Sequence, residues 1–184
     1  PQGNHLIQDF NMETGKKIRH YYTAAQDSTL LTGPYAEFYS DGKPRKKRNY
    51  KNGQRIGIWM QWYNNGQVQD SCFYNDQQNI EGIAKAWFVD GKLSDSAFYP
   101  PDSAGRGYRL HYNNTGRFMG RGPMINNQKH GIWTYFYPSG LPSLEEYYEN
   151  NKRISMICYD KNGRRMTGDC NPDREARYGN GISD

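Results

Sequence analysis

The residues whose side chains could carry out chemistry are few, and they are not spaced as a site. Four histidines stand at His5, His20, His111 and His130. None of them has a cysteine or carboxylate partner at the spacing of a metal or catalytic motif. The adjacent Glu145 and Glu146 would point to opposite sides of a strand, so they do not form the carboxylate pair of a glycosidase. The sequence therefore predicts no catalytic residue, no cofactor site and no metal site.

The cysteines could form a disulfide or remain free thiols. The chain has three of them, at Cys72, Cys158 and Cys170. An odd number excludes a fully paired set of disulfides. Cys158 and Cys170 flank the turn dipeptide Asn162-Gly163, so one bridge between neighbouring strands is open to them. The interpretation that we favour from the sequence is that all three are free and pack as small apolar side chains.

The elements that must position these residues follow from a repeat. Five glycines recur with separations of 24, 25, 25 and 24 residues: Gly33, Gly57, Gly82, Gly107 and Gly131. We call them the marker glycines. Each precedes an aromatic-rich run of strand length, and a turn dipeptide such as Asp41-Gly42 or Asn65-Gly66 then closes the run. No stretch has helical periodicity. The pattern predicts an all-β, elongated single-sheet meander of about six tandem β-hairpins of 24–25 residues.

The domain organisation follows from where this pattern holds. Residues 32–170 are expected to form the tandem hairpins, and residues 1–31 an N-terminal segment with a degenerate half-repeat around Phe10 to Gly15. Residues 171–184 break the pattern and are expected to form a polar tail. Because the chain begins with Pro1, we also expect residues upstream of it in the full coding sequence.

The composition bounds the class of protein. Aromatic residues make up 15% of the chain, with 16 tyrosines, whereas aliphatic residues are sparse. A disordered chain would be poor in tyrosine and tryptophan. We therefore expect the rings to be buried in a thin layer, with each hairpin shielding the next. No apolar run approaches the roughly 18 residues of a membrane-spanning helix.

Aromatic residues fall on both faces of the expected sheet. Period-two alternation puts Trp59 and Gln61 on one face, and Ile58, Met60 and Trp62 on the other. The sequence leaves open which of these faces is exposed. The candidate residues for contact with a protein partner are Trp59, Trp62, Trp87 and Trp133.

One basic cluster interrupts an otherwise mixed pattern of charge. The formal net charge is +5, and the cluster together with one nearby arginine comprises Lys43, Arg45, Lys46, Lys47, Arg48 and Arg55. Its simpler interpretation is a solvated strand edge whose lysines and arginines oppose aggregation. The sharper hypothesis is a patch that binds anionic lipid. Binding to nucleic acid is not expected from so mild a net charge.

These motifs resemble a known family. Glycine, then tryptophan two residues on, then an aromatic–Tyr pair and an Asn-Gly or Asp-Gly turn, repeated every 24 or so residues, is similar to the MORN repeat. The resemblance is closest to the bacterial variant form described as antitoxin-like. It covers about residues 30–170, although Ala84 stands where tryptophan is expected. It implies hairpin sheets that serve as scaffolds or membrane-associated adaptors, without an enzyme domain.

The sequence therefore predicts a non-enzymatic scaffold that binds a protein partner, without naming that partner. Three alternatives stay open: an adaptor for an anionic lipid surface, an antitoxin-like inhibitor, and a carbohydrate-binding module. The expected location is the bacterial periplasm, the outer membrane surface or the secreted space, with a cytoplasmic location also open. Oligomeric state does not follow from the sequence.

Overall fold

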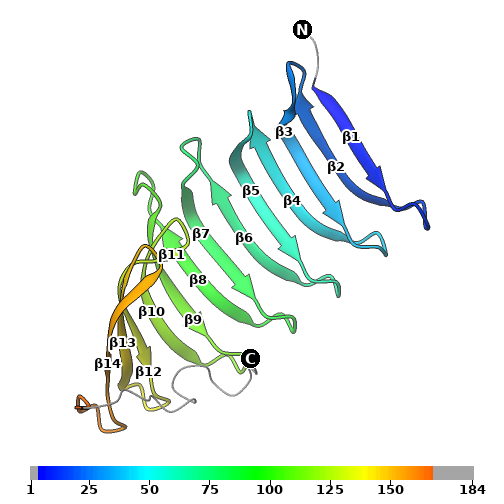
Figure 1. Ribbon diagram of the computed structural model, residues 1–184. Coiled ribbons are helices and arrows are strands. Elements are labelled where there is room, and N and C mark those ends of the chain that lie inside the picture. Colours follow the sequence, from blue (N-terminus) through cyan, green and yellow to red (C-terminus); the bar gives the residue numbers. More distant parts are fainter. Residues whose placement is uncertain (1–3, 168–184) are drawn as a thin grey trace. The chain divides into compact units, whose positions relative to one another are not determined.

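The computed structural model describes residues 4–167, and every regular element in that range is a β-strand (Figure 1). The chain divides into two compact units, Pro1–Gly91 and Lys92–Asp184. Within each unit, nearly every strand pairs in antiparallel fashion with the next strand along the chain. The predicted fold class, an all-β meander of tandem hairpins, is therefore confirmed. Cys170 and residues 171–184, the predicted tail, lie outside the described residues.

Unit 1 is a sheet of seven strands in chain order. They are β1 (His5–Phe10), β2 (Lys17–Ala24), β3 (Asp27–Phe38), β4 (Pro44–Lys51), β5 (Gln54–Trp62), β6 (Val68–Tyr74) and β7 (Ile80–Trp87). The N-terminal segment contributes the β1–β2 hairpin, in which Ile7 pairs with Tyr21.

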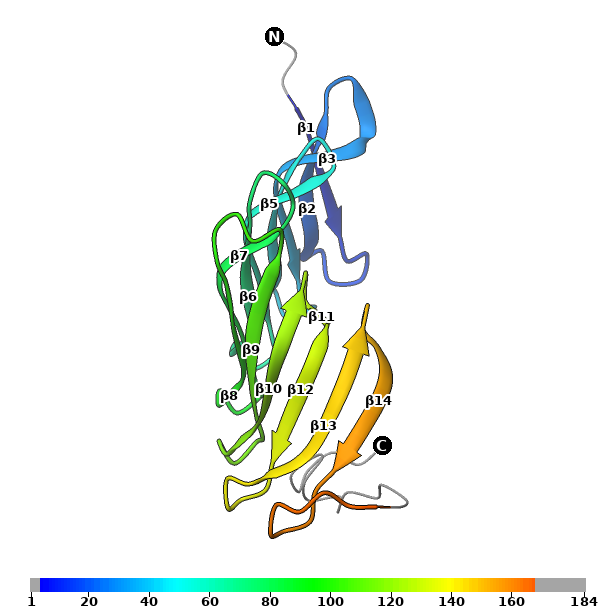
Figure 2. The ribbon, with the colours of Figure 1, turned by 90° about the vertical axis from the view of Figure 1, so that its left-hand side faces the viewer.

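Unit 2 continues the same pattern with one short addition (Figure 2). Its strands are β8 (Leu93–Tyr99), β9 (Arg106–Tyr112), β10 (Phe118–Ile125), β11 (Gln128–Lys129), β12 (Gly131–Phe136), β13 (Pro142–Glu149) and β14 (Lys152–Cys158). The two-residue strand β11 pairs with the end of β10, and β12 pairs with β10 further along. Unit 2 is thus also a single antiparallel sheet.

The turns form where the dipeptides predict them. Gly42, Gly66, Gly116 and Gly140 have φ between 84° and 90°, a conformation that only glycine adopts without strain. In each turn the glycine N–H donates to the carbonyl three residues earlier, as Gly42 does to Tyr39. The opposite ends of the hairpins use asparagine pairs, such as Asn150 and Asn151 at φ 47° and 65°. Local chemistry therefore sets the hairpin boundaries.

The marker glycines serve two different purposes. Gly33, Gly57, Gly82 and Gly131 have φ between 64° and 77°, within strands or at their first residue. At Gly57 the β4–β5 register shifts, so the strand turns a corner there. Gly107 lacks a positive φ; instead, a Cβ at this position would lie 2.4 Å from the Tyr99 ring.

Three glycines of β9 and β10 are packed against aromatic rings. Gly107 lies within β9, and Gly120 and Gly122 lie within β10. Side chains from neighbouring strands cover them: a Cβ at Gly122 would lie 2.4 Å from the Trp133 ring, and one at Gly120 would lie 2.7 Å from the Tyr135 ring. The close packing of rings on backbone, invisible in the local sequence, is the reason for these glycines.

Neighbouring repeats are joined by a recurring tyrosine. The hydroxyl of Tyr39 donates to the Trp62 carbonyl at 2.6 Å, and that of Tyr63 donates to the Trp87 carbonyl at 2.9 Å. In unit 2 the hydroxyl of Tyr137 donates to the Tyr159 carbonyl at 2.7 Å. Each bond spans 22 to 24 residues, which is about one repeat. Where the repeat motif has this tyrosine, its hydroxyl therefore links one hairpin to the next.

Replacing Tyr63 with phenylalanine tests this link. The ring stays and the hydroxyl is lost, so we expect unit 1 to lose about 1 kcal/mol of stability, the value of one hydrogen bond to a half-buried carbonyl. Urea unfolding followed by tryptophan fluorescence measures the change. Tyr22→Phe is the matched control, because among the described residues the Tyr22 hydroxyl has no hydrogen-bond partner. Equal effects of the two substitutions would contradict the role of the hydroxyl.

Candidate functional site

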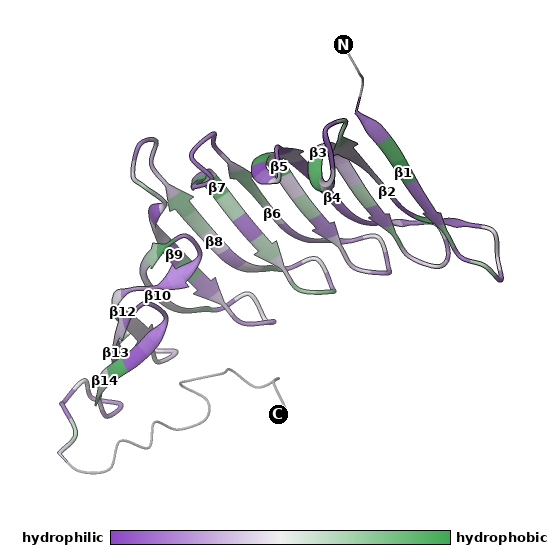
Figure 3. Cartoon of the chain, turned by 45° about the horizontal axis from the view of Figure 1, so that its top comes forward, coloured by the Kyte–Doolittle hydropathy of each residue, from purple (hydrophilic) through white to green (hydrophobic). Residues whose placement is uncertain are grey.

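Hydrophilic and hydrophobic residues are interspersed along the strands of each unit (Figure 3), and the two faces of each sheet differ in burial. In unit 1, register pairs Trp59 with Cys72 on one face and Ile58 with Phe73 on the other. In unit 2, Trp133 pairs with Glu146, and Ile132 with Tyr147. We call the side that carries Trp59 or Trp133 the ring face, and the side that carries Ile58 or Ile132 the stripe face. Most of the large buried side chains, among them Trp133 and Leu144, lie on the ring face.

The ring face of unit 1 is a row of aromatic rings that crosses five strands. Centroid separations are 5.9 Å for Tyr21–Tyr35, 6.0 Å for Tyr35–Tyr50, 5.3 Å for Tyr50–Trp59 and 5.2 Å for Trp59–Tyr74. The pairs are tilted or edge-to-face, as the ring quadrupole favours. The Trp59 indole N–H also donates to the Asn49 carbonyl at 3.2 Å. These rings hold the hairpins of unit 1 together.

The basic cluster is divided between the faces rather than gathered on one. Lys46 and Arg48 lie on the ring face, where Lys46 pairs with Glu37 at 3.2 Å and Arg48 lies 4.6 Å from the Trp59 ring centroid. Lys47 lies on the stripe face, 5.8 Å from the Trp62 ring centroid. Strand alternation thus separates charges that are adjacent in the sequence.

The remaining cations of the cluster also have partners. Arg45 lies 3.9 Å from Glu37, and Lys43 pairs with Asp41 at 2.9 Å. Arg55 donates to the Tyr74 hydroxyl at 3.1 Å, and its guanidinium lies 4.7 Å from the Tyr74 ring centroid. The arrangement favours intramolecular pairing over one continuous basic patch.

Cysteine chemistry is limited by burial and bonding. Cys72 is a free thiol on the ring face, and burial raises its pKa to about 11, with nearby Asp70 acting in the same direction. It is therefore a thiol, not a nucleophilic thiolate, at neutral pH. Cys158 is disulfide-bonded, so the expectation that all three cysteines are free is wrong at that position. Cys170, the other cysteine of the proposed bridge, lies outside the described residues.

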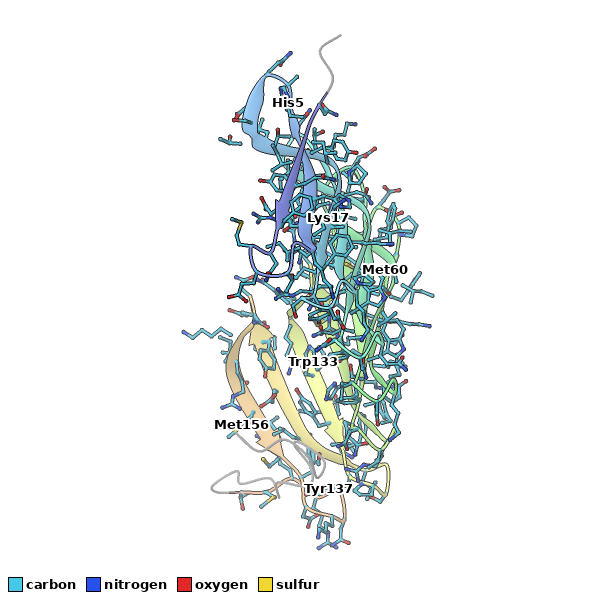
Figure 4. All side chains as sticks on the ribbon, turned by 90° about the vertical axis from the view of Figure 1, so that its right-hand side faces the viewer. His5, Lys17, Met60, Trp133, Tyr137 and Met156 are labelled. Atoms are coloured by element: carbon cyan, nitrogen blue, oxygen red, sulfur yellow. The ribbon has the colours of Figure 1, made fainter. Side chains whose placement is uncertain are left out.

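The ring face of unit 2 is more deeply buried than that of unit 1 and holds a charged cluster. Figure 4 labels Trp133 on the strands of this unit. Trp133 is 2% exposed, and its indole N–H donates to the Pro123 carbonyl at 2.9 Å. The Lys129 ammonium lies 4.5 Å from the Trp133 ring centroid and 4.8 Å from that of Tyr148. Burial lowers the pKa of Lys129, while nearby Glu146 opposes this shift. Rings and a carboxylate thus hold this lysine in a structural position.

Glu146 is the buried anion of this cluster. It accepts hydrogen bonds from Arg153 and from the Tyr148 hydroxyl, both at 2.8 Å. Burial by itself would raise the Glu146 pKa, but these bonds and nearby Lys129 lower it overall. A carboxylate with a depressed pKa in the folded state stabilises that state above its unfolded pKa. This contribution is lost as the pH falls through the lower, folded value.

Glu146→Gln is therefore expected to change the pH dependence of stability. The substitution should lower the stability of unit 2 by about 1–2 kcal/mol at pH 7, because Arg153 and Lys129 lose a charged partner. It should also flatten the fall in stability below the ordinary glutamate pKa of 4.5. Hydrogen exchange of the β12 and β13 amides across a pH series measures both effects. Glu149→Gln, at an exposed position of the same strand, is the control. An unchanged pH slope in Glu146→Gln would refute the assignment.

The stripe face carries apolar side chains that project into solvent. In unit 1 these are Ile58, Phe73 and Ile83, at 60%, 41% and 61% exposure. In unit 2 they are Phe98, Tyr108, Ile132 and Tyr147, at 54%, 46%, 57% and 37% exposure. Register pairs Ile58 with Phe73, Phe98 with Tyr108, and Ile132 with Tyr147. We call these residues the apolar stripe of each unit.

The apolar stripe was not predicted from the sequence, because the predicted contact residues were all tryptophans. A signal was present: the residue directly after a marker glycine is Ile58, Ile83, Tyr108 or Ile132 in four of the five repeats. Of the four predicted contact residues, Trp62 and Trp87 are half-buried on the stripe face, and Trp59 is half-buried on the ring face. Trp133 is buried beneath Lys129 and does not offer a surface to a partner.

The stripe face of unit 2 also holds a pocket of about 310 Å³. Its walls are Arg117, Phe118, Arg121, Phe136, Tyr137, Pro138 and Gly140. Arg121 is on the stripe face because it pairs in register with Leu110 and Thr134, whose neighbours two residues away are Tyr108 and Ile132. The pocket therefore lies beside the apolar stripe of the same unit.

Other chemistry finds little support within residues 4–167. No group of three or more His, Cys, Asp or Glu side chains in that range could hold a metal ion. The His111 Nδ1 lies 3.1 Å from the Asp95 carboxylate, and the Arg109 Nε lies 4.0 Å from the same carboxylate. His111 is therefore engaged in a contact within the sheet. The described part of the chain contains no helix with the length and apolar character needed to cross a membrane.

These features define a class: an open antiparallel array of hairpin repeats with an apolar stripe on its solvent side. Three stretches of the chain, residues 31–52, 55–76 and 129–140, match the MORN repeat variant. The resemblance to the MORN repeat drawn from the sequence is therefore confirmed for these stretches, and the match does not extend to the bacterial, antitoxin-like form. The family is not an enzyme family; its repeats are generally associated with scaffolds that bind proteins or membranes. No curated protein matches the chain.

Proposed function

We propose that the chain is a non-enzymatic scaffold whose apolar stripe binds a protein partner. The observation that carries the proposal is the stripe itself: large apolar side chains paired in register and exposed, at equivalent positions of successive repeats. Contiguous exposed apolar surface is typical of interaction sites. Half-buried Trp62 and Trp87 lie on the same face and would supply anchors at its border.

The proposed setting is the bacterial cell envelope or the secreted space. The disulfide at Cys158 supports it, because disulfides persist in oxidising compartments. Binding to an anionic membrane is the competing function. It is less well supported because the basic cluster is split between two faces and paired with Glu37, Asp41 and aromatic rings. An antitoxin-like or carbohydrate-binding role has no observation in its favour.

The test compares stripe variants with charge-matched controls. Ile58→Asp with Ile132→Asp places a charge on the stripe of each unit, whereas Gln54→Asp with Gln128→Asp places charges at exposed positions outside it. A protein recovered by crosslinking in cells is identified, purified and rebound to the chain. We expect the stripe variant to weaken that binding at least about tenfold, with little dependence on salt.

Two outcomes would refute the proposal. One is equal binding by the stripe and control variants. The other is association only with vesicles that contain acidic lipid, lost at high salt and in Lys47→Gln with Arg48→Gln. Circular dichroism of each variant establishes that the fold is retained.

A further inference from the structure

The pocket on the stripe face of unit 2 has an apolar, ring-lined floor. The Phe118 and Phe136 centroids are 5.4 Å apart with an interplanar angle of 33°, and Tyr112 continues the row at 5.8 Å from Phe118. The turn that follows β12 closes one side with Tyr137, Pro138 and Gly140. A volume of about 310 Å³ suits one planar side chain rather than a large ligand.

The charged side chains that line the pocket are all positive. Arg117 and Arg121 line it, and none of its seven lining residues is acidic. The Arg121 side chain is exposed and lies 5.6 Å from the Phe136 ring centroid; among residues 4–167 it forms no ion pair. The Arg117 Nη2 contacts the Met119 sulfur at 3.2 Å.

The nearest carboxylate along this row of the sheet is already engaged. Arg121 pairs with Thr134, and Thr134 with Glu145, which puts one strand between the arginine and that carboxylate. The Tyr159 hydroxyl donates to Glu145 at 2.9 Å. The Arg121 guanidinium lies over the Phe136 ring, and no acidic residue lines the pocket. This arrangement is complementary to an anionic group on a planar apolar body.

We propose that this pocket binds an acidic–aromatic side-chain pair of a protein partner, an inference that rests on the proposed function. The ring of the partner would lie against Phe118 and Phe136, and its carboxylate would accept hydrogen bonds from Arg121. Ile132 of the apolar stripe and Phe136 of the pocket are four residues apart on one strand, about 13 Å. The partner segment therefore presents an apolar side chain about that far from an acidic–aromatic pair.

The experiment uses a defined probe. The full chain, labelled with ¹⁵N, is titrated with the peptide acetyl-Glu-Phe-Glu-amide and with its neutral counterpart acetyl-Gln-Phe-Gln-amide. The signals followed are the arginine Nε–Hε groups and the amides of β10 and β12. We expect saturable shifts at Arg121 and Phe136 with the acidic peptide, and at least about tenfold weaker binding of the neutral one.

Variants separate charge from ring contact. Arg121→Gln and Phe136→Leu should each weaken binding of the acidic peptide about tenfold or more, whereas Arg106→Gln, which removes a charge outside the pocket, should leave it unchanged. Equal binding of the two peptides, or insensitivity to Arg121→Gln, would overturn the proposal. So would vesicles of acidic lipid that bind through Arg121 while the peptide does not.

Failure of the pocket proposal can be distinguished from failure of the proposed scaffold function. If the stripe variants Ile58→Asp and Ile132→Asp abolish partner binding but Arg121→Gln does not, the scaffold stands and the pocket assignment is wrong. If the acidic peptide binds the pocket while stripe variants leave partner binding intact, the pocket assignment stands and the stripe assignment is wrong.

Discussion

Replacing Trp133 with alanine is expected to destabilise unit 2 by about 3–5 kcal/mol, the cost of emptying a buried tryptophan site. Trp133 is 2% exposed, covers Gly122 and donates a hydrogen bond to the Pro123 carbonyl. Its loss also leaves Lys129 without the nearest ring of its cluster. Chemical unfolding followed by circular dichroism, with hydrogen exchange in β12 and β13, measures the effect.

Trp59→Ala is the matched control for this prediction. Trp59 occupies the same position after its marker glycine and donates to the Asn49 carbonyl in the same way, but it is only half-buried. We expect it to cost roughly half as much, because the cost follows the surface that is buried. A cost for Trp133→Ala no greater than for Trp59→Ala would show that the ring face of unit 2 is not the core described above.

Gly122→Ala is expected to destabilise unit 2 by about 2–3 kcal/mol although it adds only one methyl group. The backbone of Gly122 has no positive φ, so the cost does not come from the conformation of the chain. It comes from overlap: the new Cβ would lie 2.4 to 2.6 Å from three atoms of the Trp133 indole, and the packed ring has little room to move. Urea unfolding of the full chain measures the change.

A double-substitution cycle isolates this cause. In a Trp133→Ala background the ring is absent, so Gly122→Ala should cost less than about 1 kcal/mol. Additive costs of the two substitutions would contradict the steric explanation. The same cycle with Trp59→Ala is the control, because Trp59 belongs to unit 1 and Gly122 to unit 2.

The proposed binding surfaces, the apolar stripe and the pocket, are built on the same framework of repeated hairpins. The repeat provides rigid, evenly spaced strands through its turns and inter-repeat tyrosines. Residues that vary between repeats, such as Arg121 against Lys47 or Phe136 against Trp62, then place different chemistry on the same framework. Specificity in such an array would depend on these substitutions rather than on the fold.

The sequence by itself determined the hairpins and their number. Asn-Gly and Asp-Gly turns and the period of the marker glycines depend on backbone conformations that are local to a few residues. The tyrosines of the motif at Tyr39, Tyr63 and Tyr137 were also readable from the sequence, although their hydrogen-bond partners were not. Period-two alternation also correctly separated Trp59 from Ile58.

Only the tertiary structure decided which face is buried. Alternation predicts which residues share a face of the sheet, but it does not predict which face is covered by other side chains. That depends on how side chains from adjacent strands pack over the backbone, as the Trp133 ring does at Gly122. In the tertiary structure Trp133 lies in the core, whereas Ile132 is exposed. The run of cations from Lys43 to Arg48 is divided between the two faces of the sheet. The pocket of Arg117 and Arg121 likewise exists only because two strands bring their ends together.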